Sequence, residues 1–148
     1  VAVWFRVDAL PPANTFSLIV GKGNQPARSY SLFIRGDGAV DWSTDSTNGR
    51  LQNNCSRETC QVGSWNQAVG VIDSNTMHLY LNGVEAADPL PIKGSVAFDE
   101  TPLMLGRSRE PNAEYLPFTG AIDEMSIFAR ALSAEEIAEM YRTGNPER

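Results

Sequence analysis

Residues 118–144 read FTGAIDEMSIFARALSAEEIAEMYRTG, and this stretch decides the fold. Its first half carries apolar, β-forming residues over the length of one strand, at Ile122, Met125, Ile127 and Phe128. A strand needs neighbours to pair with, and every plausible partner lies upstream in the chain. The stretch therefore predicts a sheet protein that is completed by one last strand and one short helix.

The second half of the stretch predicts the one long helix of the chain. Ser133 is a favourable N-cap, and Glu136 three residues later completes a capping box. Leu132 before the cap and Ile137 after it are spaced for a hydrophobic staple. Gly144 is expected to end the helix. The apolar positions that would face a sheet are three and four residues apart, at Ile137, Met140 and Tyr141.

The composition restricts the class of protein. With 148 residues the chain is long enough to bury a sizeable core, and we expect one domain over residues 1–148. The net charge of −6 argues against a nucleic-acid partner, since phosphate binding needs a basic surface. No run of about 18 apolar residues is present, so we expect no insertion into a membrane. Strand-like alternation begins at Val1 itself, and we expect the chain to be a segment of a larger protein.

Short strands and polar turns fill the rest of the chain. Residues 43–54 have little apolar content and predict a loop, which residues 55–60 continue. Many short strands with almost no helix indicate a β-sandwich or barrel. The expected strands are residues 1–7, 16–20, 30–34, 39–42, 65–72, 76–81 and 103–105.

The two cysteines, Cys55 and Cys60, lie close together in NNCSRETCQ. The pair alone is a poor metal site, since zinc normally takes four ligands. We expect a local disulfide, with two free thiols as the alternative. In the loop-entropy description such a bond would contribute roughly 2 kcal/mol. It would persist only in an oxidising compartment, which favours a secreted or cell-surface protein.

Four fragments together resemble a known family. They are VWFRV at 3–7, IVGKG at 19–23, a tryptophan strand with its hairpin partner at 65–83, and residues 118–144. The closing motif is Gly-x-Ile-Asp-Glu followed by Leu-Ser-x-x-Glu-Ile, here at 120–124 and 132–137. In this order the fragments are similar to the laminin G-like and pentraxin-like branch of the concanavalin A-like lectin and glucanase superfamily.

The resemblance implies an all-β fold, an antiparallel jelly-roll β-sandwich with one short C-terminal helix. It also implies a first strand that would precede Val1, and it suggests calcium as a cofactor. Calcium takes six to eight oxygen ligands, and Asp123 is the one position that we nominate as a ligand. The alternative is that the Asp123 carboxylate accepts hydrogen bonds from backbone amides.

Glycoside hydrolases also occur in this superfamily, so catalysis has to be considered. Such enzymes need two carboxylates held at a defined separation. Asp123 and Glu124 are adjacent and would point to opposite faces of a strand. A serine or cysteine nucleophile would need a histidine base, and the single histidine, His78, has no motif around it. We therefore expect no enzyme, with a glycoside hydrolase as the enzymatic alternative.

Two polar loops are the candidate binding residues, because loops on a rigid sandwich commonly carry function. Arginine and asparagine can donate hydrogen bonds to sugar hydroxyls, and tyrosine offers a flat amphipathic surface. For Trp4, Trp42 and Trp65 we expect core packing, with a sugar-stacking platform as the alternative. The candidate ligand-binding residues are Arg107, Arg109, Asn112 and Tyr115 in one loop, and Asn24, Arg28 and Tyr30 in the other.

These features predict a non-catalytic binding module of a secreted or cell-surface multidomain protein. Its expected partner is a glycan or an extracellular protein. The alternative is a structural domain without a small ligand, which packs against neighbouring domains of the parent chain or in a surface assembly.

Overall fold

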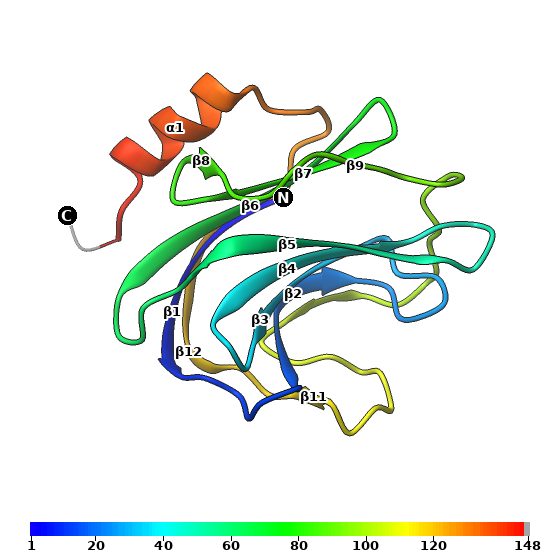
Figure 1. Cartoon of the computed structure of the whole chain (residues 1–148), viewed down its shortest axis with the longest axis horizontal. Coiled ribbons are helices and arrows are strands. Elements are labelled where there is room, and N and C mark those ends of the chain that lie inside the picture. Colours follow the sequence, from blue (N-terminus) through cyan, green and yellow to red (C-terminus); the bar gives the residue numbers. More distant parts are fainter. Residues whose placement is uncertain (147–148) are drawn as a thin grey trace.

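The computed structural model describes residues 1–146 and shows two facing β-sheets (Figure 1). Nearly all neighbouring strands are antiparallel; only the short β11 runs parallel to its partner β2. The first sheet has the order β12-β1-β6-β7-β8, with β9 also paired to β7. Its strands are β1 (Ala2–Ala9), β6 (Trp65–Asp73), β7 (Thr76–Leu81), β8 (Val84–Glu85), β9 (Leu90–Pro91) and β12 (Thr119–Ser126).

The second sheet has the order β10-β2-β3-β4-β5, and β11 extends it beside β2. The expected all-β sandwich, consistent with a concanavalin A-like jelly roll, is therefore confirmed. Within residues 1–146, no helix is long and apolar enough to cross a membrane. The strands of the second sheet are β2 (Phe16–Lys22), β3 (Tyr30–Arg35), β4 (Ala39–Asp45), β5 (Leu51–Thr59), β10 (Leu103–Leu105) and β11 (Tyr115–Leu116).

The core lies between the sheets and is built from alternate residues of each strand. Trp42 lies flat against β6, where a Cβ atom on Gly70 would come within 2.4 Å of its ring. Only glycine fits at that position. Trp4 points to the opposite side of the first sheet and stacks on Tyr141 at 5.5 Å between ring centroids. Packing is therefore the role of both tryptophans, as expected.

The helix α1 (Ala134–Thr143) covers the outer face of the first sheet (Figure 1). The capping box is confirmed: Ser133 Oγ accepts the backbone N–H of Glu136, and the Glu136 carboxylate accepts that of Ser133. Ile137 is fully buried and packs in one cluster with Leu132 and residues of β1, β6 and β7. The backbone N–H of Gly144 closes the helix on Met140.

The polar stretch at residues 43–60 is a strand pair, and the predicted loop is wrong. β4 continues to Asp45 and β5 occupies 51–59. The inward polar side chains of β5 find partners among backbone groups. Asn54 Nδ2 donates to the carbonyl of Asp88 at 3.0 Å, and Gln52 Oε1 accepts the N–H of Lys93 at 3.0 Å. Ser56 Oγ accepts the N–H of Val40 at 2.9 Å, so hydrogen bonds compensate for the missing apolar side chains.

The predicted Cys55–Cys60 disulfide is also wrong, because both cysteines are free thiols in the structure. Five residues along an extended strand span about 16 Å, whereas a disulfide needs Cα atoms within about 7 Å. The two side chains also lie on opposite faces. Cys60 is buried in the core, and Cys55 lies on the outer face, 3.4 Å from Arg35 Nη1. The compartment inferred from this bond loses its support.

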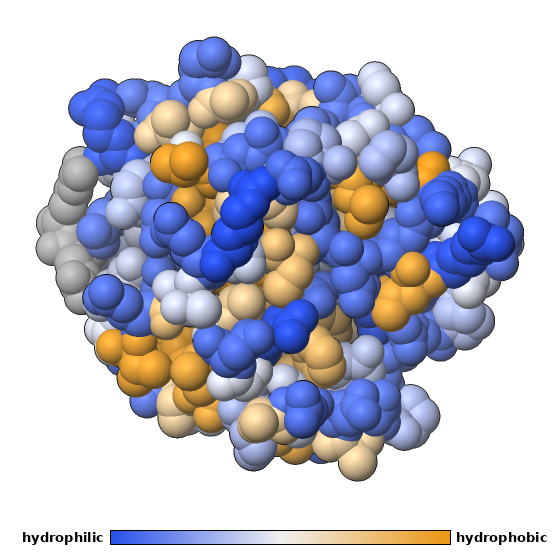
Figure 2. Space-filling view, in the orientation of Figure 1, coloured by the Kyte–Doolittle hydropathy of each residue, from blue (hydrophilic) through white to orange (hydrophobic). Residues whose placement is uncertain are grey.

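The outermost strands of one side, β10 and β12, each pair with a single neighbour among the described residues. We call β10, β12 and Ile127–Phe128 the open edge. Ile127 and Phe128 were expected inside the last strand, but β12 ends at Ser126 and both side chains are exposed. Leu103 and Leu105 alternate with Met104, which packs on the outer face, so they face the first sheet yet remain exposed. The face over β5 and β8, by contrast, is largely hydrophilic with small apolar spots (Figure 2).

Candidate functional site

The two polar loops expected to bind ligand meet on the outer face of the second sheet. Arg28, between β2 and β3, reaches Glu110 and Tyr115, which lie more than 80 positions later in the sequence. Arg28 Nε donates to Glu110 Oε1 at 3.2 Å, and Nη2 of Arg28 forms an ion pair with the same oxygen. Arg28 Nη2 also donates to the Tyr115 hydroxyl at 3.2 Å. We call Arg28, Glu110 and Tyr115 the clamp, since they hold the later loop on the sheet.

The clamp is buried and strongly paired. Arg28 is only 1% exposed, and burial alone would lower its pKa. Its hydrogen bonds to Glu110 and Tyr115 outweigh burial and raise the pKa of Arg28 above the ordinary value. The guanidinium also lies over the rings of Phe33, at 5.2 Å, and Tyr115, at 5.7 Å. Arg28 is thus a permanent cation whose Nε and Nη2 donors are used within the protein.

Three aromatic rings make an apolar cluster beside the clamp. Tyr115 stacks on Phe33 at 5.1 Å between ring centroids. Phe16 packs edge-on against Phe33 and at a tilt against Tyr115. Phe33 is buried beneath the others, whereas Phe16 and Tyr115 are partly exposed. The cluster therefore offers a half-exposed aromatic surface on the outer face of the sheet.

A hollow with a volume of about 240 Å³ lies against this surface, and we call it the outer-face pocket. Its aromatic wall is Phe16, Phe33 and Tyr115. A neighbouring hollow of 530 Å³ shares Phe16 and Glu114 and adds Arg35 and Asp37, so the two hollows adjoin, and we call them together the outer-face depression. The polar groups of the outer-face pocket include Asp41 and Ser43 of β4, Asn53 of β5, and Asn112 and Glu114 of the loop before β11.

Asp41 is the most deeply placed carboxyl group in the outer-face pocket. It is 3% exposed, and the Ser43 hydroxyl donates to its Oδ1. Burial raises the pKa of Asp41, although the Ser43 hydrogen bond and the more distant Arg35 and Arg28 partly oppose that rise. The side chain of Asn53 beside it is exposed on β5 and makes no described hydrogen bond, so its amide can meet a ligand.

The structure brings together only some of the predicted binding residues. Arg28, Asn112 and Tyr115 line the outer-face pocket. Arg107 and Arg109 lie on the same loop but line a separate hollow beside β10. Whether any of these residues binds a ligand stays a prediction.

The other two predicted residues lie away from the outer-face pocket. Tyr30 turns inward and stacks on Trp42 at 6.0 Å. Asn24 is held by its backbone N–H, which donates to Asp99 Oδ2 at 3.2 Å. Sequence reasoning missed Asp41, Ser43 and Asn53. Their signal was strand alternation, since Asp41 and Ser43 share one face of β4 and are paired with Cys55 and Asn53 of β5.

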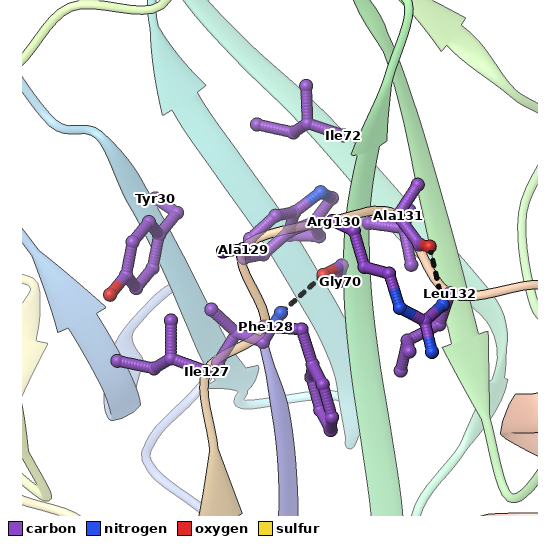
Figure 3. A pocket seen from close by; sticks show the side chains of 12 residues that line it. Tyr30, Gly70, Ile72, Ile127, Phe128, Ala129, Arg130, Ala131 and Leu132 are labelled. Carbon is purple, nitrogen blue, oxygen red and sulfur yellow. Dashed lines mark hydrogen bonds between the residues drawn. The ribbon is translucent and has the colours of Figure 1, made fainter.

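Another hollow, of 250 Å³, lies at one end of the open edge (Figure 3). Tyr30, Trp42, Ile72, Ile127 and Phe128 surround it. Its wall is mostly apolar or backbone, and Trp42 Nε1 is buried without a described hydrogen-bond partner. It offers few polar side chains to hydroxyl groups, so the outer-face pocket is the better candidate for a polar ligand.

Asp123, the position nominated as a calcium ligand, lies on β12. Asp123 is exposed, and its Oδ1 accepts the backbone N–H of Glu124 at 2.8 Å, which agrees with the alternative interpretation. Nowhere in residues 1–146 do three His, Cys, Asp or Glu side chains gather as potential metal ligands. Calcium, which prefers six to eight oxygen ligands, stays a prediction.

Solved structures share the fold of the chain. The sialidase carbohydrate-binding module of Ruminococcus gnavus, solved with α2,3-sialyllactose, is 19% identical with a TM-score of 0.75, covering 95% of this chain and 80% of that one. Domain 4 of an extracellular arabinanase from Geobacillus stearothermophilus, solved with arabinotriose, is 20% identical with a TM-score of 0.72, covering 95% and 64%. A pentraxin from Limulus polyphemus is 12% identical with a TM-score of 0.68, covering 99% and 70%.

This chain is shorter than several of the proteins that it resembles, and it spans 39% of the length of a carbohydrate-binding protein from Bacteroides ovatus. At these identities the likeness shows the fold alone. No curated protein matches the sequence. A sequence model described as the concanavalin A-like lectin/glucanases superfamily matches residues 1–138. Because that match spans nearly the whole sequence, the chain belongs to the concanavalin A-like lectin/glucanases superfamily.

Proposed function

We propose that the chain is a non-catalytic module that binds carbohydrate in the outer-face pocket. The observation that carries the proposal is the pocket itself, in which a half-exposed aromatic wall stands beside amide and carboxylate side chains. Sugars present an apolar C–H face and a rim of hydroxyl groups. The C–H face can stack on the rings of Tyr115 and Phe16. The hydroxyl groups can form hydrogen bonds with the side-chain amides of Asn53 and Asn112.

Solved structures with the same fold support a sugar as the ligand. The Ruminococcus gnavus module was solved with sialyllactose and the arabinanase domain with arabinotriose. Both are parts of larger enzymes, and the arabinanase is extracellular, so we propose an extracellular parent protein with several domains for this chain as well.

The carboxyl groups near the outer-face pocket support binding over catalysis. Glu110 is used by Arg28, and Asp41 accepts the Ser43 hydroxyl while burial raises its pKa. Hydrolysis of a glycosidic bond needs two carboxyl groups at a defined separation, and in this pocket Glu114 alone has a carboxylate without a side-chain partner among the described residues.

The open edge favours a second candidate function, which is packing against a neighbouring domain. Its exposed apolar side chains, Leu103, Leu105 and Ile127, resemble an interface more than an ordinary surface. This function and carbohydrate binding use different parts of the molecule, so they are tested separately.

The test is binding of the protein to an oligosaccharide array, followed by titration calorimetry with the best ligand, with and without calcium. Asn53→Ala combined with Asn112→Ala should weaken binding about tenfold or more, since two hydrogen bonds are lost. The control is Arg107→Ala combined with Arg109→Ala, which changes the same loop outside the outer-face pocket. Equal affinity of both double variants would remove the pocket from the site, and turnover of a polysaccharide would overturn the non-catalytic function.

A further inference from the structure

The two arginines of the outer-face depression are each paired with a carboxylate. Arg28 is paired with Glu110, and both side chains are almost fully buried. Arg35 Nη2 lies 3.2 Å from Asp37 Oδ2, and its Nη1 donates to Cys55 Sγ at 3.4 Å. The buried Arg28 therefore presents no solvent-facing fork to the carboxylate of a ligand, whereas Arg35 is 38% exposed and lines the neighbouring hollow and not the outer-face pocket.

Two carboxyl groups of the same depression have no cation partner in the described residues. Asp41 accepts only the hydroxyl of Ser43. Glu114 is exposed at the junction of the two hollows, and its described hydrogen bonds are made by its backbone alone. The positive charges here are therefore balanced by their own partners, and the uncompensated charge is negative.

Freeing Arg28 for an acidic ligand would be costly. Its release would leave Glu110 as a buried carboxylate without its partner, which is the strongly destabilising case for an ion pair. A neutral sugar avoids that cost, because its hydroxyl groups can donate to a carboxylate such as that of Glu114.

We infer that the outer-face pocket takes neutral sugars and excludes acidic ones, such as sialic and uronic acids, with Glu114 as a specificity-determining residue. This inference rests on the proposed carbohydrate-binding function. The Glu114 carboxylate accepts hydrogen bonds from the hydroxyl groups of a neutral sugar. It repels the carboxylate of an acidic sugar at short range, where solvent screens the two charges only in part.

The test compares matched pairs of oligosaccharides that differ only in one acidic sugar. Suitable probes are lactose with 3′-sialyllactose, and xylotetraose with and without a glucuronic acid branch. The acidic member of a pair should bind at least about tenfold more weakly than the neutral one at low salt. Glu114→Gln should reduce that ratio severalfold, as should high salt. Glu58→Gln on β5, which removes the same charge outside the depression, should leave the ratio unchanged.

Each outcome has a defined meaning. If an acidic probe binds as tightly as its neutral partner, the inference is overturned while the carbohydrate-binding function stands. An unchanged ratio in Glu114→Gln overturns the role of Glu114. If no neutral or acidic oligosaccharide on the array binds, the proposed function fails, and the inference fails with it.

Discussion

Cys60 lies in the core beside β4, and burial raises the pKa of its thiol to about 12. Cys55 is half-buried on the outer face, where burial also raises its thiol pKa. Thiolates are the reactive form, so the native protein should react with an alkylating agent slowly at Cys55 and scarcely at all at Cys60. Mass spectrometry of labelled peptides measures both rates. Protein that is denatured without a reducing agent should take up two labels per molecule. Uptake of no label would show that Cys55 and Cys60 form a disulfide.

Asp41 is expected to make stability depend on pH. Its pKa is raised in the folded protein above the ordinary 3.8, because burial disfavours the charged form. Its contribution to stability is therefore full below the ordinary pKa and is lost as the pH rises through the raised value. Asp41→Asn, which stays neutral, should gain stability relative to the wild type as the pH rises from about 4 to about 7.

Urea denaturation at several pH values measures this effect. Asp73→Asn, which changes the exposed last residue of β6, is the control and should show no comparable trend. A constant difference in unfolding free energy between Asp41→Asn and the wild type would contradict the assignment.

Side-chain roles were the least predictable feature of the sequence. Arg28 and Tyr30 looked alike, as polar residues flanking one turn. The structure buries Arg28 in an ion pair and turns Tyr30 onto Trp42, because strand register decides which way each points. Glu110, the partner of Arg28, lies 82 positions later in the sequence, and no local pattern predicts such a contact.

At the scale of elements, the capping box of α1 can be tested directly. Ser133→Ala removes the side chain that accepts the N–H of Glu136, and it should cost about 1 kcal/mol of unfolding free energy. Ser95→Ala is the matched control, since Ser95 is exposed and only its backbone is hydrogen-bonded. A denaturation midpoint shared by both variants would count against the capping box.

The clamp joins the 107–117 loop to the sheet and should contribute to stability. Arg28→Met would leave Glu110 buried without its partner and should cost about 3–5 kcal/mol. Arg57→Met breaks an exposed ion pair with Asp88 and should cost about 0–1 kcal/mol. Chemical denaturation measures the free energy of unfolding of both variants. Similar decreases would show that the buried clamp contributes no more to stability than the exposed ion pair.

Elements were predictable where their signals are local. The helix has its staple, cap and stop between Leu132 and Gly144, and the tight turns contain their own glycine and asparagine residues. β5 was not predictable, because its inward Gln52, Asn54 and Ser56 form hydrogen bonds with distant backbone groups in place of apolar packing.

At the scale of the whole molecule, the open edge should make residues 1–148 associate with one another when produced alone. Exposed edge strands with apolar side chains are templates for pairing with another chain. Leu105→Lys should reduce concentration-dependent association in sedimentation velocity, because a charge at an edge opposes such pairing. Val62→Lys changes a side chain of similar exposure, 53% against 51%, in a turn away from this edge, and should have no effect. A wild-type protein that stays monomeric at high concentration would contradict the prediction.

The clamp also makes the domain suitable as a scaffold for engineered binders. Glu110 and Tyr115 anchor the loop on both sides of residues 111–114, so the span between them is already closed on the sheet. Lengthening a closed loop changes its closure entropy only slowly with length. A library of randomised and inserted residues at 111–114, with Arg28, Glu110 and Tyr115 kept, would therefore vary the recognition surface while the sandwich beneath it stays folded.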